Sequence, residues 1–540
     1  DSEETAGRST NSNEAPALLI GSAQDITIGT VEGRDGTYSL VIDGSVSSSS
    51  IYSSFDSSGV VIGGQGGTVD LSGGIGVSGS VSARTVDSSA VALVINEGVT
   101  APILENSGEI SAELSSSGEG SVIAVQDLSG TLVTVNNSGF IVADGSNEDT
   151  TIALDLGANT SGVSITQFLN ELDAETRAEL EAEEDYDFEN PAVFTSITGD
   201  IVTGSGDDTI DIQTGVVSGD TFLGAGDDSL SLSDNARYDG DIFSGSGSFS
   251  LTLADDARFE GTLNAANDSA TVIISDQALY SGLFENADSV SVNVVGGTLE
   301  APEGDTVAFN ELVVGSNGVL AVTINEDDDI QSGFDVNQAT FEEGAQVSAD
   351  VQSITGVEGS YTILTADTID GTPELDFAGD ALPLLFTGEL VTTDTDITLS
   401  LRTKSAEELG LSQPQSQAYD SLIIQALEVD LLEQSFLDVE DEAQLQGQLE
   451  GLLPDYTGGT FDFVTRASRQ FTKNLADGKA FYDISPVGGW LEPIYFEGSK
   501  DTGETAAFAN VGWGISAGLE RDFGFGYLGF GLVYATGTVS

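Results

Sequence analysis

Three similar segments follow one another in the middle of the chain: GDIVTGSGDDTIDIQTGVVS (199–218), GDTFLGAGDDSLSLSDNARYD (219–239) and GDIFSGSGSFSLTLADDARFE (240–260). The glycines that open these segments, and those that open the next two at Gly261 and Gly282, lie 20, 21, 21 and 21 residues apart. Within each segment, short runs alternate apolar and polar residues, which is the pattern of a half-buried β-strand. A constant period of this length predicts a right-handed β-helix or similar solenoid, whose stacked coils bury one another's apolar faces.

The same kind of repeat continues toward the N-terminus at looser spacing. A glycine followed by a short alternating strand recurs at four positions: Gly44, Gly79, Gly108 and Gly139. The alternative fold, a β-sandwich, would have less regular spacing. We therefore expect a mainly all-β chain with a disordered lead-in over 1–17 and a β-solenoid over 18–309. Looser strands with glycine turns predict a cap of the solenoid over 310–401.

An acidic segment, residues 165–191, interrupts the repeat. Its apolar residues fall at helical spacing, Pro191 ends the pattern, and it carries ten acidic residues and one arginine. These features predict a helical insert. Two interpretations of this helix remain open: a solvated helix that lies over the solenoid, or a protruding contact element.

Composition excludes several classes of function. The chain has 90 acidic and 14 basic residues in 540, a formal net charge of −76, which disfavours binding to nucleic acid or to anionic lipid. It contains no histidine and no cysteine, so Ser-His-Asp and Cys-His catalytic arrangements are impossible within it. We expect no enzyme activity. Paired carboxylates that cleave sugars remain the alternative, because some glycosidases need only two acids.

The clearest candidate for a bound ion is the repeated Gly-x-Gly-Asp-Asp motif. It occurs as GSGDDTI (204–210) and GAGDDSL (224–230), similar to the core of calcium-binding nonapeptide repeats. Carboxylate oxygens suit a hard cation such as Ca²⁺, and the candidate ligands are Asp207, Asp208, Asp227 and Asp228. The simpler interpretation is that these are Gly-Asp turns whose carboxylates bond the backbone.

The last quarter of the chain differs in kind from the rest. Residues 402–487 are rich in Leu, Gln, Glu and Ala and predict a helical linker, including an amphipathic helix over 461–478. Residues 488–540 then alternate apolar with small residues, which is typical of strands that cross an outer membrane. The side chains predicted to face lipid are Trp513, Ile515, Leu519, Leu528, Phe530, Leu532 and Tyr534. The alternative is that the aromatic residues are core residues of a soluble β-domain.

Taken in order, these parts resemble the autotransporters of type V secretion. The resemblance covers about residues 300–540 most closely, and over 18–300 only the style of repeat matches. The segments that carry it are SAEELGLSQPQSQAYD (405–420), GLLPDY (451–456), GGWLEP (488–493), VGWGISAGLERDF (511–523) and GYLGFGLVY (526–534).

The resemblance implies a Gram-negative outer-membrane protein with its passenger displayed at the cell surface. The barrel portion would mediate translocation and anchoring, and a helix within 460–480 would thread the pore, for which Gly512, Gly514 and Gly518 leave room. Because open strand edges are not tolerated in lipid, the remaining strands of the barrel are expected beyond Ser540.

The expected partners follow from the same resemblance. They are outer-membrane lipid, the barrel-assembly machinery, and an unknown surface ligand or host or biofilm partner of an adhesive or structural passenger. No cofactor other than calcium is expected. The competing function is a secreted, carboxylate-dependent, polysaccharide-degrading enzyme on a β-helix scaffold.

Overall fold

The chain forms two compact units, and the chain taken as a whole is mostly β-strand. The parallel-sheet unit comprises residues 1–352, 357–382 and 388–401, and the C-terminal unit comprises 353–356, 383–387 and 402–540. The computed structural model describes residues 15–33, 36–52, 54–114, 120–145, 150–169, 195–266, 268–325, 332–354, 356–376, 382–413, 415–417, 419, 430–439, 441–452, 458–476, 482–484, 487–500 and 508–539.

Three long sheets make up most of the parallel-sheet unit. Sheet 1 has 10 strands: β1 (Leu18–Ile20), β7 (Ser57–Ile62), β11 (Ala90–Ile95), β15 (Ser121–Asp127), β18 (Thr150–Asp155), β21 (Asp200–Val202), β24 (Thr221–Phe222), β27 (Ile242–Phe243), β30 (Leu263–Asn264) and β33 (Phe284–Glu285). Sheet 2 has 13 strands: β6 (Ser45–Ser49), β10 (Ser80–Thr85), β14 (Glu109–Leu114), β17 (Phe140–Asp144), β20 (Ser196–Thr198), β23 (Val216–Ser218), β26 (Arg237–Asp239), β29 (Arg258–Glu260), β32 (Leu279–Ser281), β35 (Thr298–Glu300), β37 (Val319–Ile324), β39 (Gln346–Val351) and β41 (Glu374–Leu375).

Sheet 3 has 15 strands and turns antiparallel at one end. In order across the sheet they are β5 (Leu40–Ile42), β9 (Ile75–Val77), β13 (Ile103–Asn106), β16 (Thr134–Asn137), β19 (Ser164–Gln167), β22 (Thr209–Ile212), β25 (Asp228–Leu232), β28 (Phe249–Leu253), β31 (Ala270–Ile274), β34 (Val290–Val294), β36 (Thr306–Val314), β38 (Gly333–Phe341), β40 (Gly359–Asp370), β43 (Asp396–Thr403) and β42 (Phe386–Thr392). Two small sheets join β2 (Ile26–Thr27), β8 (Val69–Asp70) and β12 (Val99–Thr100), and β3 (Val31–Glu32) with β4 (Thr37–Tyr38).

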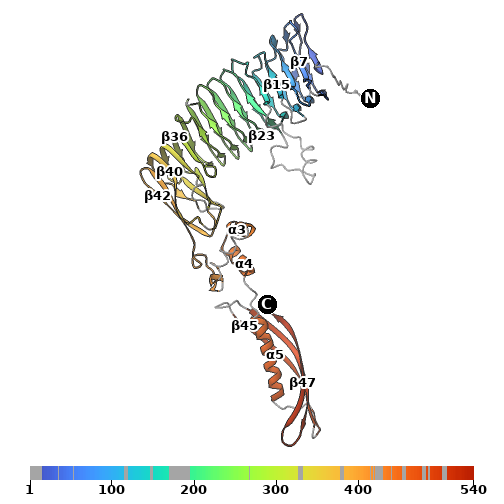
Figure 1. Ribbon diagram of the computed structural model, residues 1–540, viewed down its shortest axis with the longest axis vertical. Coiled ribbons are helices and arrows are strands. Elements are labelled where there is room, and N and C mark those ends of the chain that lie inside the picture. Colours follow the sequence, from blue (N-terminus) through green and yellow to red (C-terminus); the bar gives the residue numbers. More distant parts are fainter. Residues whose placement is uncertain are drawn as a thin grey trace, which may run out of the picture. The chain divides into compact units, whose positions relative to one another are not determined.

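Successive strands of the chain belong to the three sheets in turn. Strands β21, β22 and β23 lie in sheets 1, 3 and 2, and β24, β25 and β26 repeat that order one coil later. Figure 1 shows these coils as successive layers from β7 through β15 and β23 to β36. The arrangement is compatible with the predicted solenoid, because each strand is paired with the equivalent strands of the coils before and after it.

The strand register follows the period of the sequence. Thr209 pairs with Ser229, and Ser229 pairs with Ser250, so neighbouring coils are offset by 20 and then 21 residues. Equivalent inward side chains consequently stack into buried columns, of which one is Ile210, Leu230, Leu251, Val272 and Val292. A second buried column is aromatic: the rings of Tyr238, Phe259 and Tyr280 have centroids 5.3 and 4.8 Å apart. These columns confirm the periodic core predicted from the repeats.

The glycines that mark the period lie where backbone stacks directly on backbone. A Cβ on Gly261 would lie 1.9 Å from the carbonyl oxygen of Gly240, and one on Gly282 would lie 1.7 Å from that of Gly261. Both glycines also have positive φ angles, of 153° and 159°. The repeat therefore requires glycine at this corner on steric grounds.

The structure corrects one part of the sequence prediction and modifies another. Residues 164–167 form β19, which pairs with β16 and β22 on its two sides, so the acidic helix predicted from Ile165 does not begin there. Most of that insert, residues 170–191, lies outside the described residues. In the predicted cap region, β40 pairs in parallel with β38 but antiparallel with β43, which ends the parallel stacking of sheet 3.

The C-terminal unit contains helices and an antiparallel sheet. The helices are α3 (Asp430–Leu437), α4 (Glu442–Leu452) and α5 (Gly458–Ala476), and the sheet consists of β44 (Tyr482–Ile484), β45 (Val487–Lys500), β46 (Phe508–Asp522) and β47 (Tyr527–Val539). Helix α5 lies along β45, β46 and β47 and contacts all three (Figure 1). Among the described helices, none combines the length and the apolar character that crossing a lipid bilayer requires.

Candidate functional site

The Asp-Asp motifs place their two aspartates on opposite faces of the coil. Asp207 and Asp227 are exposed, whereas Asp208 and Asp228 are buried. The buried pair is in phase with the inward residues Ile210 and Leu230, because successive residues of a strand point to opposite sides. The four predicted calcium ligands therefore form two separate pairs.

The exposed pair bonds toward the following coil. Asp207 Oδ1 accepts a hydrogen bond from the backbone N–H of Asp227 (2.9 Å). In turn, Asp227 Oδ1 accepts hydrogen bonds from the N–H (3.0 Å) and the hydroxyl (2.8 Å) of Ser248. The two Ser248 donors stabilise the charged form and lower the pKa of the Asp227 carboxyl.

The buried pair bonds in the opposite direction, toward the preceding coil. Asp208 Oδ1 accepts from the N–H of Val163 (2.7 Å), and Asp228 Oδ1 accepts from the N–H of Asp208 (2.8 Å). The register puts Phe249 at the same position one coil later. The two carboxyls thus interrupt a buried column between the apolar side chains of Val163 and Phe249.

Burial dominates the acidity of the inner pair. It raises the pKa of the Asp208 carboxyl and raises that of Asp228 to about 6. The backbone hydrogen bond from Asp208 opposes the shift at Asp228, and the negative charges of Asp208, Asp207 and Asp227 reinforce it. A carboxyl that is removed from water and surrounded by like charges binds its proton more tightly.

This geometry does not assemble a calcium coordination sphere. Calcium takes six to eight oxygen ligands, and each pair here supplies carboxylates whose Oδ1 atoms already bond the backbone. Within the described ranges, no group of three or more Asp, Glu, His or Cys side chains could hold a metal ion. Calcium binding at Asp207, Asp208, Asp227 and Asp228 stays a prediction from the sequence.

A second aspartate ladder was missed by the sequence reasoning. Asp200, Asp220 and Asp241 follow the period glycines, and the Oδ1 of each accepts the N–H of the equivalent residue one coil later: Asp220 (3.0 Å), Asp241 (2.9 Å) and Thr262 (2.7 Å). The signal was present as GD at 199, 219 and 240. These aspartates therefore serve as acceptors between coils, which accounts for part of the acidic composition.

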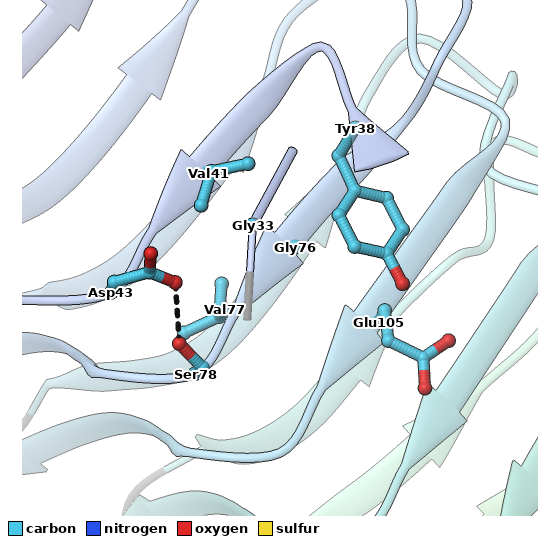
Figure 2. A pocket seen from close by; sticks show the side chains of 8 residues that line it. All are labelled: Gly33, Tyr38, Val41, Asp43, Gly76, Val77, Ser78 and Glu105. Atoms are coloured by element: carbon cyan, nitrogen blue, oxygen red, sulfur yellow. Dashed lines mark hydrogen bonds between the residues drawn. The ribbon is translucent and has the colours of Figure 1, made fainter. Parts of the chain in front are cut away.

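A small cavity lies among the N-terminal coils (Figure 2). Its volume of about 10 Å³ has room for one water molecule at most. In it, the Ser78 hydroxyl donates to Asp43 Oδ1 (2.6 Å), and the Tyr38 ring packs over Gly76, where a Cβ would lie 2.3 Å from ring atom Cδ2. The cavity is too small for a sugar or a nucleotide, so we assign these side chains a packing role.

The buried aspartate pair does not fit a sugar-cleaving site. Glycosidases need two carboxyls that reach the substrate from either side. Here Asp208 and Asp228 are 1% and 3% exposed, and their second oxygens are fully buried. A polysaccharide cannot contact them in the folded coil.

One face of the C-terminal sheet is strongly apolar and exposed. Cross-strand pairs bring its side chains together: Tyr495 with Trp513, Ile515 with Tyr534, and Leu519 with Phe530. All seven residues predicted to face lipid are on this exposed face: Trp513, Ile515, Leu519, Leu528, Phe530, Leu532 and Tyr534. The largest of these residues, Trp513, is 61% exposed, which is unusual for so large an apolar side chain in water.

The opposite face of the same sheet is built from glycine and packs against α5. A Cβ on Gly537 would lie 2.6 Å from Phe463, and one on Gly531 would lie 3.0 Å from Phe471, both side chains of α5. Trp490 lies on this face and is only 8% exposed. The helix therefore occupies the room left by the glycines.

Polar contacts fix the position of α5 on the sheet. Asp462 forms an ion pair with Arg466 one helical turn on and also accepts a hydrogen bond from Asn510 Nδ2 (2.8 Å) of β46. Arg466 in turn donates to the carbonyl oxygen of Glu497 (3.1 Å) in β45. Sequence reasoning did not find this cluster, because its members are up to 48 residues apart.

Comparisons with known proteins add no assignment. No family model matches the chain, and no curated protein or solved structure matches it.

Proposed function

We propose that the chain is an autotransporter, which displays a right-handed β-helical passenger at the surface of a Gram-negative bacterium and is anchored in the outer membrane by its C-terminal strands. The observation that carries the proposal is the two-faced sheet β45–β47. One face exposes large apolar side chains, and the other is lined with glycine and covered by α5.

Lipid is the environment that suits the exposed face. An apolar patch of this kind is unfavourable in water, and it marks a surface that contacts a membrane or a partner. The strands β45, β46 and β47 have 14, 15 and 13 residues, longer than the 9–11 residues that a tilted strand needs to cross a bilayer. Aromatic side chains among the aliphatic ones are typical of membrane-spanning strands.

The parallel-sheet unit suits the role of a displayed passenger. Its coils are held by columns of buried side chains and by aspartates that accept hydrogen bonds between coils, without any disulfide in a chain that lacks cysteine. One part of this proposal rests on the resemblance alone. It is that the passenger has an adhesive or structural role, toward a surface ligand or toward a host or biofilm partner. Outer-membrane lipid and the barrel-assembly machinery are the partners proposed for the C-terminal strands.

Localisation of the protein in cells tests this proposal. With its complete reading frame expressed in a Gram-negative host, we expect the protein in the outer-membrane fraction, and we expect intact cells to bind an antibody raised against residues 199–300. Protease added outside intact cells should remove that signal while a periplasmic marker survives. Recovery of the protein in a soluble fraction, protected from external protease, would refute the proposal.

A further inference from the structure

One corner of the parallel-sheet unit exposes three large apolar side chains. It joins β6 to β7 over residues 50–56, whereas the equivalent corner one coil later, between β10 and β11, spans only 86–89. Ile51 is 72% exposed and Tyr52 is 61% exposed, more than any other large apolar side chain described in this unit. Together with Phe55, which is 38% exposed, they form what we call the apolar corner.

Hydrogen bonds to the next coil hold the apolar corner in place. The Ser54 N–H donates to Asp87 Oδ1 (2.6 Å), and the Thr85 hydroxyl donates to the carbonyl oxygen of Phe55 (2.9 Å). The backbone of the corner is thus tied to the next coil, while its apolar side chains are exposed to solvent. A segment that is already ordered loses little conformational entropy when it binds, so this corner is suited to a contact.

The apolar corner lies in a stretch without charge. Residues 44–55, GSVSSSSIYSSF, contain no acidic or basic side chain, although the whole chain carries a formal net charge of −76. The exposed polar residues that the structure describes in this stretch are serines, which are Ser45, Ser47 and Ser54. The contact surface is therefore apolar with a neutral polar border, and the charge of the whole chain disfavours an anionic partner.

The size of the apolar corner indicates what kind of partner it fits. Ile51, Tyr52 and Phe55 together expose roughly 300–400 Å², taking about 150–250 Å² for a whole aromatic side chain. A specific protein interface needs about 800 Å² on each partner. A lipid surface requires no matching shape, and binding to it increases with the apolar area inserted. The apolar corner is therefore better suited to a lipid surface than to a protein or a second copy of this chain.

We propose that the apolar corner inserts into a membrane whose surface lipids are zwitterionic, such as phosphatidylcholine. Ile51 and Phe55 enter the boundary between headgroups and acyl chains, and Tyr52 places its ring there with its hydroxyl toward water. Zwitterionic lipid is the class that fits, because anionic headgroups repel so acidic a chain. The inference names a partner for the proposed passenger and rests on its display at the cell surface, where a second membrane is within reach.

Retention of vesicles by cells that display the protein tests this proposal. Cells expressing the complete reading frame are mixed with dye-labelled phosphatidylcholine vesicles, and the antibody against residues 199–300 measures display. We expect a variant that combines Ile51→Ser, Tyr52→Ser and Phe55→Ser to be displayed normally, because these side chains are exposed. It should retain at least about fivefold fewer vesicles than wild type, because the inserted apolar area is gone. Wild-type cells should retain fewer vesicles when about a third of the lipid is phosphatidylserine.

Val295→Ser is the matched control for the combined serine variant. Val295 is 49% exposed in the same unit but lies outside the apolar corner, so its replacement removes exposed apolar surface without changing the proposed contact. We expect this variant to retain as many vesicles as wild type. Absence of the antibody signal from wild-type cells would refute the proposed function, whereas a normal signal without vesicle retention would refute this inference alone.

The purified full chain gives a readout that does not need surface display. Because the chain contains no cysteine, Ile51→Cys introduces a single attachment point for an environment-sensitive dye. With phosphatidylcholine vesicles we expect the dye emission to shift to shorter wavelength, and this shift should disappear when Tyr52→Ser and Phe55→Ser are added. The same dye attached through Val295→Cys should not respond, even if the C-terminal sheet enters the vesicle.

Four results would overturn the proposal. One is that the combined serine variant retains vesicles as well as wild type. Another is that vesicles containing phosphatidylserine are retained better than neutral ones. The third is an equal dye response from the two cysteine variants. The last is dimerisation of the purified chain that the serine substitutions abolish, without vesicle retention, which would assign the apolar corner to a second copy of the chain.

Discussion

Replacing Gly108 with valine is expected to destabilise the parallel-sheet unit by about 3 kcal/mol or more, at the upper end of the usual cost of overpacking. A Cβ at this position would lie 2.0 Å from the carbonyl oxygen of Gly79 in the preceding coil. The backbone cannot move aside cheaply, because that same oxygen accepts the N–H of Glu109 (2.9 Å). The clash is between main-chain atoms and the new side chain, so no change of rotamer relieves it.

Gly44→Val is the matched control for Gly108→Val. Gly44 begins the same column of glycines, but a Cβ there meets nothing within 4 Å, so the change should stay within about 0.5 kcal/mol of wild type. Urea denaturation, together with hydrogen exchange over residues 75–145, measures both variants. Equal stability of the two variants would contradict the stacking of backbone on backbone that defines the coils.

On the proposed outer-membrane function, replacing Gly518 with valine is expected to reduce assembly of the C-terminal strands into the membrane at least about tenfold, by far more than an ordinary surface change. A Cβ on Gly518 would lie 1.8 Å from ring atom Cη2 of Trp490, which is buried on the face of the sheet that carries α5. The indole would have to leave its place over Gly518 and Gly531. The yield of membrane-embedded, protease-resistant C-terminal fragment measures the effect.

Gly526→Val provides the comparison for Gly518→Val. Gly526 lies in the turn between β46 and β47, and a Cβ there meets nothing within 4 Å. We expect normal assembly of this variant, and we expect Trp490→Ala to restore part of the assembly lost in Gly518→Val. Normal assembly of Gly518→Val by itself would show that the glycine face is not packed as described.

Much of the parallel-sheet unit could be predicted from the spacing of its glycines. The 20- and 21-residue steps are the offsets of the strand register, because a solenoid repeats the same contacts in every coil. The prediction of an acidic helix from Ile165 was wrong at its start, because pairing between coils also decides the structure there. Helical spacing of Ile165 and Leu169 is a local signal, whereas β19 is held by ladders on both sides, and tertiary pairing overrides local propensity.

The aspartates show where motif reading falls short. The sequence GSGDDTI is similar to a calcium-binding repeat. Sequence similarity over seven residues does not show which side chains come close enough together to bind one ion. The alternation was available: Asp208 is in phase with Ile210 and Ile212, so it points inward while Asp207 points outward. The burial of Asp208 and Asp228 depends on the coils above and below, and only the structure reveals it.

The C-terminal sheet was partly predictable because its strands alternate apolar with small residues. Alternation along 511–519 assigned Trp513 to the exposed face, and the structure confirms that exposure. Alternation could not assign the surroundings of Trp490, whose buried ring packs over Gly518 and Gly531 of the two neighbouring strands. Contact of the exposed face with lipid remains the proposal.

The chain's two tryptophans offer the most direct test of that proposal, because they lie on opposite faces of one sheet. Trp490→Phe leaves Trp513 as the sole indole, and Trp513→Phe leaves Trp490. In vesicles of brominated phospholipid made with protein purified from outer membranes, we expect Trp513 to lose at least about half of its fluorescence and Trp490 to keep most of its own, since lipid-facing aromatic residues contact the bilayer directly. If Trp513 were instead quenched by aqueous iodide and untouched by brominated lipid, the exposed face would not be a membrane face and the proposed function would be wrong.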